Sequence, residues 1–276
     1  MREDLTLFDE IDLDPGPTKR IRLDISYDGT GFRGLAPNTG VRTVVGELQR
    51  VLAPFLGMVP DIVMSGRTDA GVHSSGQVLS FDAPERTADP ERIGRIVTSR
   101  LGPEIVARQC SVVPDTFSAR FSATGRRYRY TVLNLAVPDP FLARTAWWVP
   151  EPLDLGAMRL ACDPLIGEHD YSSFCRRPKS VDGSEVSLVR RVNSARWDAL
   201  GGGILLFEIA GPAFCHQMVR SIVGFHVAVG RGRRSAGELL GVLTARNRNA
   251  AENPAPPHGL NLCEVQYEEP IPGWSA

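Results

Sequence analysis

The residues with the clearest chemical potential lie in Ser65–His73, which reads Ser-Gly-Arg-Thr-Asp-Ala-Gly-Val-His. Asp69 lies between Gly66 and Gly71, which would let the backbone turn sharply on both sides of the carboxylate. The neighbouring Arg67 should favour the ionised form of Asp69, and an ionised carboxylate acts as a base or a nucleophile rather than as a general acid. The pattern Gly-x-x-Asp-x-Gly also occurs in ordinary turns, and taken alone it favours that second interpretation.

Two further residues could take part in recognition or catalysis. Tyr128 lies among three arginines, including Arg127, and an aromatic ring among cations can stack on a nucleobase while phosphates are held. Its spacing fits an inward-facing strand residue better. Arg220 lies on a predicted helix, away from the apolar face, and could pair with a carboxylate in a two-pronged geometry that lysine cannot copy. A simply solvated arginine is the alternative.

The histidines offer a different constellation. His73 and His216 could form a metal site with Asp69, but no pair of histidines has the local spacing of a metal-binding motif. His73 is therefore expected to support its own loop. The sequence contains no P-loop, no Gly-x-Gly-x-x-Gly and no Ser- or Cys-centred nucleophile motif. We accordingly expect neither a metal nor a bound cofactor.

The overall composition is typical of a globular protein. The 276 residues are 42% hydrophobic and 23% charged, which suits one large domain or two modest ones. No apolar run approaches the length of a membrane span, so no membrane association is expected. The five cysteines lie far apart. Their spacing argues against a zinc cluster and a disulfide framework, and favours a cytoplasmic location.

Charge is distributed unevenly along the chain. Residues 1–17 contain six acids and one base, which leaves 30 basic and 26 acidic residues elsewhere, a net charge of +4. Several of the bases are clustered, as in Arg126, Arg127 and Arg129. Such clusters are usually solvated, so they permit RNA binding without requiring it.

Periodicity predicts the elements that must position these residues. An acidic flexible tail over 1–18 precedes the fold. Alternating apolar residues predict strands, and apolar residues at helical spacing predict helices, with Thr43, Asp89 and Ser235 as start signals. The expected strands cover 20–27, 62–64, 77–81, 104–113, 126–134, 189–197, 204–209 and 260–267. The expected helices cover about 44–55, 90–101, 155–166, 215–229 and 235–245.

This order of elements indicates an α+β fold with mainly antiparallel sheets flanked by helices. Similar orders of elements recur in two stretches, which predicts two similar α/β halves. The N-terminal half would cover 19–120 and carry the Asp69 loop, and the C-terminal half would cover 121–270.

Several motifs, in order, resemble those of the TruA family of tRNA pseudouridine synthases, over about residues 20 to 267. The matching segments are Tyr27–Phe32 with Gly34, Val41–Val44, Gly66–His73 with Gly76–Val78, Phe117–Ala123, Arg127–Tyr130, Gly167–Phe174, Met218–Gly224 and Ala255–Leu262. The resemblance implies a pseudouridine-synthase fold with an active-site cleft between the halves. It also implies a cofactor-free isomerase.

The family's roles can be placed on the matching residues. Asp69 would be the nucleophile that starts cleavage of the bond between uracil and ribose, after which uracil turns and rejoins the ribose through carbon. Arg67 and Arg220 would keep Asp69 ionised, and Tyr128 would stack on the base and could help to remove the proton from carbon 5. The candidate catalytic residues are Asp69, Tyr128 and Arg220. The candidate substrate-binding residues are Arg67, His73, Arg127, Tyr128 and His216.

The resemblance further implies a tRNA substrate, with uridines of the anticodon stem-loop as targets, and a homodimer. One departure is visible: Gly34-Leu35-Ala36-Pro37 stands where the family usually has Gly-Trp-Gln. Arg33 and Asn38 could replace the lost aromatic and amide groups. This departure motivates an alternative from another class, an RNA-binding or tRNA-folding protein that keeps the scaffold with an altered substrate or lost activity.

Overall fold

The structure is a computed structural model that describes residues 16–177 and 186–268. Most of the predicted acidic tail, residues 1–15, lies outside the described residues. Thr18, the last residue assigned to that tail, already belongs to the first strand.

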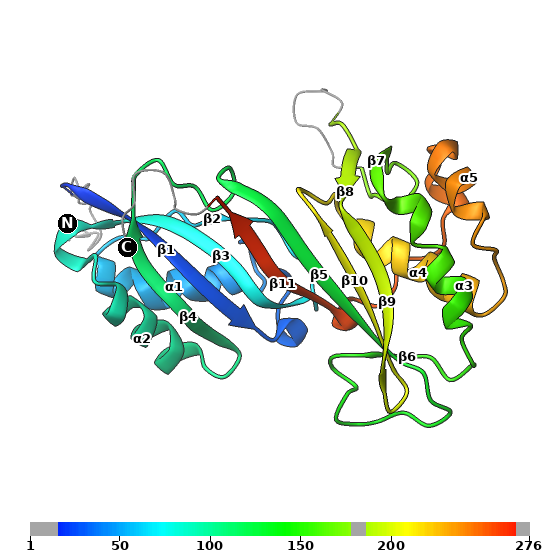
Figure 1. The fold of residues 1–276 in the computed structure, drawn as a ribbon. Coiled ribbons are helices and arrows are strands. Elements are labelled where there is room, and N and C mark those ends of the chain that lie inside the picture. Colours follow the sequence, from blue (N-terminus) through cyan, green and yellow to red (C-terminus); the bar gives the residue numbers. More distant parts are fainter. Residues whose placement is uncertain (1–15, 178–185, 269–276) are drawn as a thin grey trace, which may run out of the picture.

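A mixed sheet of nine strands runs through the described part of the molecule (Figure 1). Its main strands follow the order β4-β1-β3-β11-β5-β10-β9, with β2 beside β3 and β6 beside β5. The pairings are antiparallel except those of β11 with β3 and of β5 with β6. A separate hairpin joins β7 and β8. The strands are β1 (Thr18–Tyr27), β2 (Val63–Met64), β3 (His73–Pro84), β4 (Ile105–Val113), β5 (Ala123–Leu133), β6 (Trp147–Trp148), β7 (Gly167–Asp170), β8 (Val189–Val192), β9 (Ser194–Gly201), β10 (Ile204–Gly211) and β11 (Leu260–Tyr267).

Helices cover the sheet in two groups, α1 and α2 beside β1, β3 and β4, and α3, α4 and α5 beyond β9 and β10 (Figure 1). Two of the predicted start signals act as N-caps. The Thr43 side chain accepts from Gly46 N, and the Asp89 side chain accepts from Arg92 N. The helices are α1 (Val44–Leu56), α2 (Pro90–Leu101), α3 (Leu155–Leu160), α4 (Met218–Gly230) and α5 (Glu238–Ala245).

The buried apolar residues form two cores. One gathers residues 21–105 from β1, α1, β3 and α2, and the other is built mainly from residues 113–265 around β5, β10 and α4. The α+β prediction with a mainly antiparallel sheet is confirmed. The two halves share one sheet, however, because β11 at the end of the chain inserts between β3 and β5. The division at residues 120 and 121 stays a prediction.

Several element boundaries differ from the predicted ones. The strand expected over 77–81 is β3 over His73–Pro84, and the helix expected from Ser235 begins at Glu238, with Gly237 at the N-cap position. Three further differences have a local cause. The helix expected over 155–166 ends at Leu160 and is followed by a 3-10 turn over Asp163–Leu165, because Pro164 has no N–H to donate to Leu160 O as a continued α-helix requires. The helix expected from 215 begins at Met218, because Gln217 has a left-handed φ of 65°. The strand expected over 189–197 is divided into β8 and β9 at Asn193, whose N–H donates to Ala210 O.

Candidate active site

The Asp69 loop connects β2 to β3, and the buried side-chain amide of Gln77 holds its first residues. The Gln77 side chain is fully buried, accepts from Ser65 Oγ at 2.5 Å and donates to Gly66 O at 3.1 Å. Val72 N donates to Asp69 O at 3.2 Å and closes the turn. Gly71 has a φ of +78°, as the glycine pattern predicts, whereas Gly66 does not adopt positive φ. Only the second glycine is therefore needed for the turn.

The loop also rests on the N-terminal half. Tyr27 Oη and Thr68 Oγ1 share a buried hydrogen bond of 2.7 Å, and Leu35 N donates to Thr68 O at 3.3 Å. Gly34 has a φ of +107°, and a Cβ there would lie 3.2 Å from Thr68 O. Leu35 itself is fully buried in the N-terminal core. The residue that departs from the family pattern is therefore a core residue whose main chain bonds to the Asp69 loop.

Two side chains from the C-terminal half contact the Asp69 carboxylate, which is 23% exposed. Arg220 donates through Nη1 to Oδ2 at 2.8 Å, and His216 Nε2 lies 3.2 Å from Oδ1. Arg220 also donates through Nε to Ala255 O at 2.7 Å, so its guanidinium is fixed at two points. The expected pairing of Asp69 with Arg220 is present, but it consists of one bond to the carboxylate and not of the expected two-pronged pair. The carboxylate is neither enclosed nor turned away from this helix.

Helix α4 explains why Arg220 points to Asp69. Every residue of α4 except Arg220 is buried, so the helix passes through the C-terminal core rather than over it. Ala255 N donates to Arg220 O at 2.9 Å, which holds the chain before β11 against the helix. A Cβ at Gly224 would lie 2.1 Å from Asn253 O, so only glycine permits this approach.

His216 belongs to residues 212–217, which connect β10 to α4 and are called here the 212–217 segment. Phe214 in this segment contacts the Tyr128 ring edge-on, with 5.2 Å between the ring centroids. Cys215 forms a disulfide with Cys175, with 5.9 Å between their Cα atoms. The expectation of no disulfide is therefore wrong for this pair. The reason is that 40 residues of chain separate two cysteines that the fold brings together.

Tyr128 lies on β5 between β10 and β11, opposite Ile209 and Leu262. It is 8% exposed. Burial raises its pKa to about 12, while the Arg126 charge acts to lower that pKa and the Asp69 charge to raise it. Tyr128 is therefore a neutral phenol at neutral pH, and it lies close enough to Asp69 for their charges to interact.

Arg127 lies on the opposite face of the sheet from Tyr128, because side chains alternate along a strand. It forms an ion pair with Glu264 of β11. Arg129, on the same face, pairs with Glu208 at 2.8 Å. The arginines beside Tyr128 are thus engaged within the sheet.

His73 and Arg67 do not contact the Asp69 carboxylate. His73 Nδ1 accepts from Gly29 N at 3.1 Å, and Nε2 donates to Arg144 O at 2.8 Å. These contacts join His73 to the turn at Gly29 and to the chain at Arg144, and the expectation that His73 supports its own loop stays a prediction. Arg67 is exposed, and within the described residues it makes no ion pair or hydrogen bond. The substrate-binding roles assigned to these two residues stay predictions.

Three residues of this region are absent from the predicted site residues. Gln77 and Thr68 lie in segments that resemble family motifs, but no role is assigned to them, and Phe214 resembles any core aromatic. Only the buried polar position of Gln77, between strand residues, could have suggested a structural role. Their importance follows from contacts between segments that are distant in the chain.

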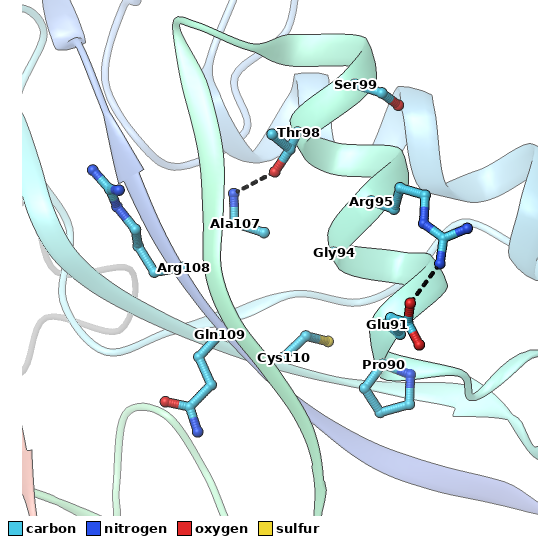
Figure 2. Close-up of a pocket in the computed structure, with 10 residues that line it drawn as sticks. All are labelled: Pro90, Glu91, Gly94, Arg95, Thr98, Ser99, Ala107, Arg108, Gln109 and Cys110. Atoms are coloured by element: carbon cyan, nitrogen blue, oxygen red, sulfur yellow. Dashed lines mark hydrogen bonds and ion pairs between the residues drawn. The ribbon is translucent and has the colours of Figure 1, made fainter.

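Other regions do not provide a competing site. In the described residues, no group of three or more His, Cys, Asp or Glu could hold a metal ion. No helix in the described part is long and apolar enough to cross a membrane. A pocket between α2 and β4 is lined by Glu91, Arg95 and Cys110 among others (Figure 2). It contains none of the predicted site residues and lies beside the edge strand of the sheet.

Comparison with known proteins gives a consistent result. A family model described as "tRNA pseudouridine synthase" matches residues 161–268. The chain is 38% identical over 268 residues to tRNA pseudouridine synthase A of Leifsonia xyli, covering 90% of this chain and 91% of the relative. It is 41% identical over 243 residues to tRNA pseudouridine synthase A of Halalkalibacterium halodurans, covering 88% and 90%. The corresponding protein of Geobacillus is 39% identical over 252 residues, covering 91% and 99%.

A solved structure titled as a Cbf5–Nop10–Gar1 complex contains a chain that matches 89% of this chain and 50% of its own length, at 16% identity and a TM-score of 0.35. That similarity is too low to carry an argument about fold or function. The sequence relatives are decisive, because they extend over both halves of the described sheet and include the Asp69 loop as well as α4. This chain therefore belongs to the TruA family of tRNA pseudouridine synthases.

Proposed function

We propose that this protein converts uridine to pseudouridine in tRNA, with Asp69 as the nucleophile. The observation that carries the proposal is the accessible Asp69 carboxylate, held by Arg220 at 2.8 Å and His216 at 3.2 Å, close to Tyr128. Family membership and the printed names of the relatives support the choice of reaction.

The proposed reaction rearranges one bond and leaves the composition unchanged. Asp69 attacks ribose C1′ as the bond from C1′ to uracil N1 breaks, and the released uracil turns in the site. C5 then bonds to C1′ as the bond from C1′ to Asp69 breaks, which restores the free carboxylate; C5 loses its proton, and N1 gains one. Arg220 orients the carboxylate, because its guanidinium bonds to Asp69 Oδ2 and is itself anchored on Ala255 O.

Tyr128 is proposed to contact the uracil by stacking. Its pKa of about 12 keeps the phenol protonated at neutral pH, so stacking suits it better than removing the C5 proton. The Phe214 edge contact covers part of the ring before RNA binds. A base that stacks on Tyr128 must therefore displace or share the place of Phe214.

The finer predictions belong to the same proposal. We expect the targets to be uridines of the anticodon stem-loop, the active form to be a homodimer, and the location to be the cytoplasm. Target uridines must leave their stack to reach Asp69. Arg67 lies two residues before Asp69 in the same loop and is exposed, and we expect its side chain to contact the RNA backbone.

The test compares the wild-type protein with Asp69→Asn on an unmodified tRNA transcript, with pseudouridine mapped at each position. The wild-type protein should form product, and the variant should form none while its affinity for tRNA stays within about threefold, because the lost charge serves chemistry rather than binding. Salt-sensitive tRNA binding without product by the wild type would favour the alternative RNA-binding or tRNA-folding function. Product formation by Asp69→Asn would refute Asp69 as the nucleophile.

A further inference from the structure

We propose that Arg126 is a positioning residue for this reaction, fixing the distance between the Asp69 loop and the segment that carries His216. The inference rests on the proposed function, because it assigns Arg126 a part in the same chemistry. The sequence alone groups Arg126 with Arg127 and Arg129 as a basic cluster that could hold phosphates. Its contacts in the folded protein are of a different kind.

Arg126 lies on the same face of β5 as Tyr128, two residues away, whereas Arg127 and Arg129 lie on the other face. Its partners across the sheet are Gly211 of β10 and Val265 of β11. The guanidinium reaches the end of β10, where the 212–217 segment begins.

The guanidinium contacts three segments through their carbonyl oxygens. Nη2 donates to Ser65 O at 2.6 Å, at the start of the Asp69 loop. Nη1 donates to Pro212 O at 2.5 Å, at the start of the 212–217 segment. Nη2 also lies 3.4 Å from Arg120 O, in the chain before β5.

These partners leave little capacity for a phosphate. All three acceptors are main-chain carbonyls, and within the described residues Arg126 has no carboxylate partner that RNA could replace. One planar guanidinium instead joins the loop that carries Asp69 to the segment that carries His216. Lysine could not reproduce this fork, because it has a single nitrogen.

Removal of Arg126 should change the rate of the reaction and not the affinity for tRNA. Without Arg126, the segments at Ser65 and Pro212 lose their common donor, and the distance between Asp69 and His216 is free to vary. A displacement of about 1 Å between reacting groups can lower a rate by about 100-fold. Binding of tRNA should persist, because the groups released are main-chain carbonyl oxygens, which do not attract phosphates.

The test measures kcat and KM for pseudouridine formation in the full-length protein carrying Arg126→Met or Arg126→Lys. We expect Arg126→Met to lower kcat by about 10- to 100-fold while KM changes by less than about threefold. Arg126→Lys, which keeps the charge and one donor, should recover part of the loss. Arg95→Met serves as the control, because it removes an exposed arginine of α2 that pairs with Glu91 and lines a pocket with none of the site residues, and kcat should change by less than about twofold.

Each outcome decides the question. A KM that rises several-fold at unchanged kcat would assign Arg126 to RNA binding and overturn the proposal, as would wild-type kcat in Arg126→Met. If Arg126→Met does not fold, a reduced kcat in folded Arg126→Lys supports the proposal and a wild-type kcat overturns it. A wild-type protein that forms no product instead refutes the proposed function, which separates that failure from failure of the Arg126 assignment.

Discussion

Replacing Arg220 with lysine should slow the reaction while leaving tRNA affinity nearly unchanged. Arg220 makes two charge-assisted hydrogen bonds, to Asp69 Oδ2 at 2.8 Å and to Ala255 O at 2.7 Å. A single lysine nitrogen at the end of a flexible chain cannot maintain both bonds in the same geometry. One of the two must therefore weaken.

The magnitude follows from the strength of such a bond. A hydrogen bond to a charged group contributes about 1.5–3 kcal/mol. If that amount is lost from the transition state, kcat should fall by roughly 10- to 150-fold. The unfolding free energy should fall by less, because lysine still neutralises Asp69 and keeps one bond.

The assay is kcat and KM for pseudouridine formation, with the unfolding free energy measured in urea. Arg231→Lys is the matched control. Arg231 follows α4 at the other end of the helix and pairs with Glu151 at 2.9 Å, distant in the chain from the Asp69 loop. A kcat within about twofold of wild type in Arg220→Lys would refute the argument. So would a variant in which only KM changes, since that result would place Arg220 in RNA binding.

Three further predictions concern stability. Burial lowers the pKa of His226 to about 3, so the unfolded state takes up a proton first as the pH falls below about 6.5. The unfolding free energy should therefore be unaffected by this group above about pH 6.5 and should fall by about 1.4 kcal/mol per pH unit towards pH 3. Urea unfolding between pH 7 and 4 should show this slope, and His226→Gln should flatten it. Reducing the Cys175–Cys215 disulfide should lower the unfolding free energy by about 3–4 kcal/mol, given the 40-residue separation; an unchanged urea midpoint in dithiothreitol would contradict this. Leu35→Ala should lower the unfolding free energy by about 2–5 kcal/mol, because the fully buried side chain leaves a cavity in the N-terminal core; a loss below about 1 kcal/mol in the same assay would contradict this.

Local patterns in the sequence were sufficient to predict most of the elements. Alternation over 20–27 reports a strand whose Ile21, Leu23 and Ile25 are fully buried, and it appears as β1. Thr43 and Asp89 cap α1 and α2 because a side-chain oxygen can satisfy the free N–H groups of a first helical turn. These signals are readable because each depends on residues within one turn or one strand. The pairing of Asp69 with Arg220 was predictable only through the family resemblance, since 151 residues separate them.

Tertiary structure alone decided how the candidate site is held. Alternation along the strand separates Arg127 and Arg129 from Tyr128, but the sequence does not give the partners of these arginines. Arg127 pairs with Glu264, whereas Arg126 bonds to carbonyls of the loops beside the active site. The sequence likewise contains Cys175 and Cys215 without indicating that they meet. Composition and spacing describe which groups are available, whereas charge pairing, burial and disulfide formation depend on distances through space. Those distances are set when β11 closes the sheet between the two halves and brings α4 against the Asp69 loop.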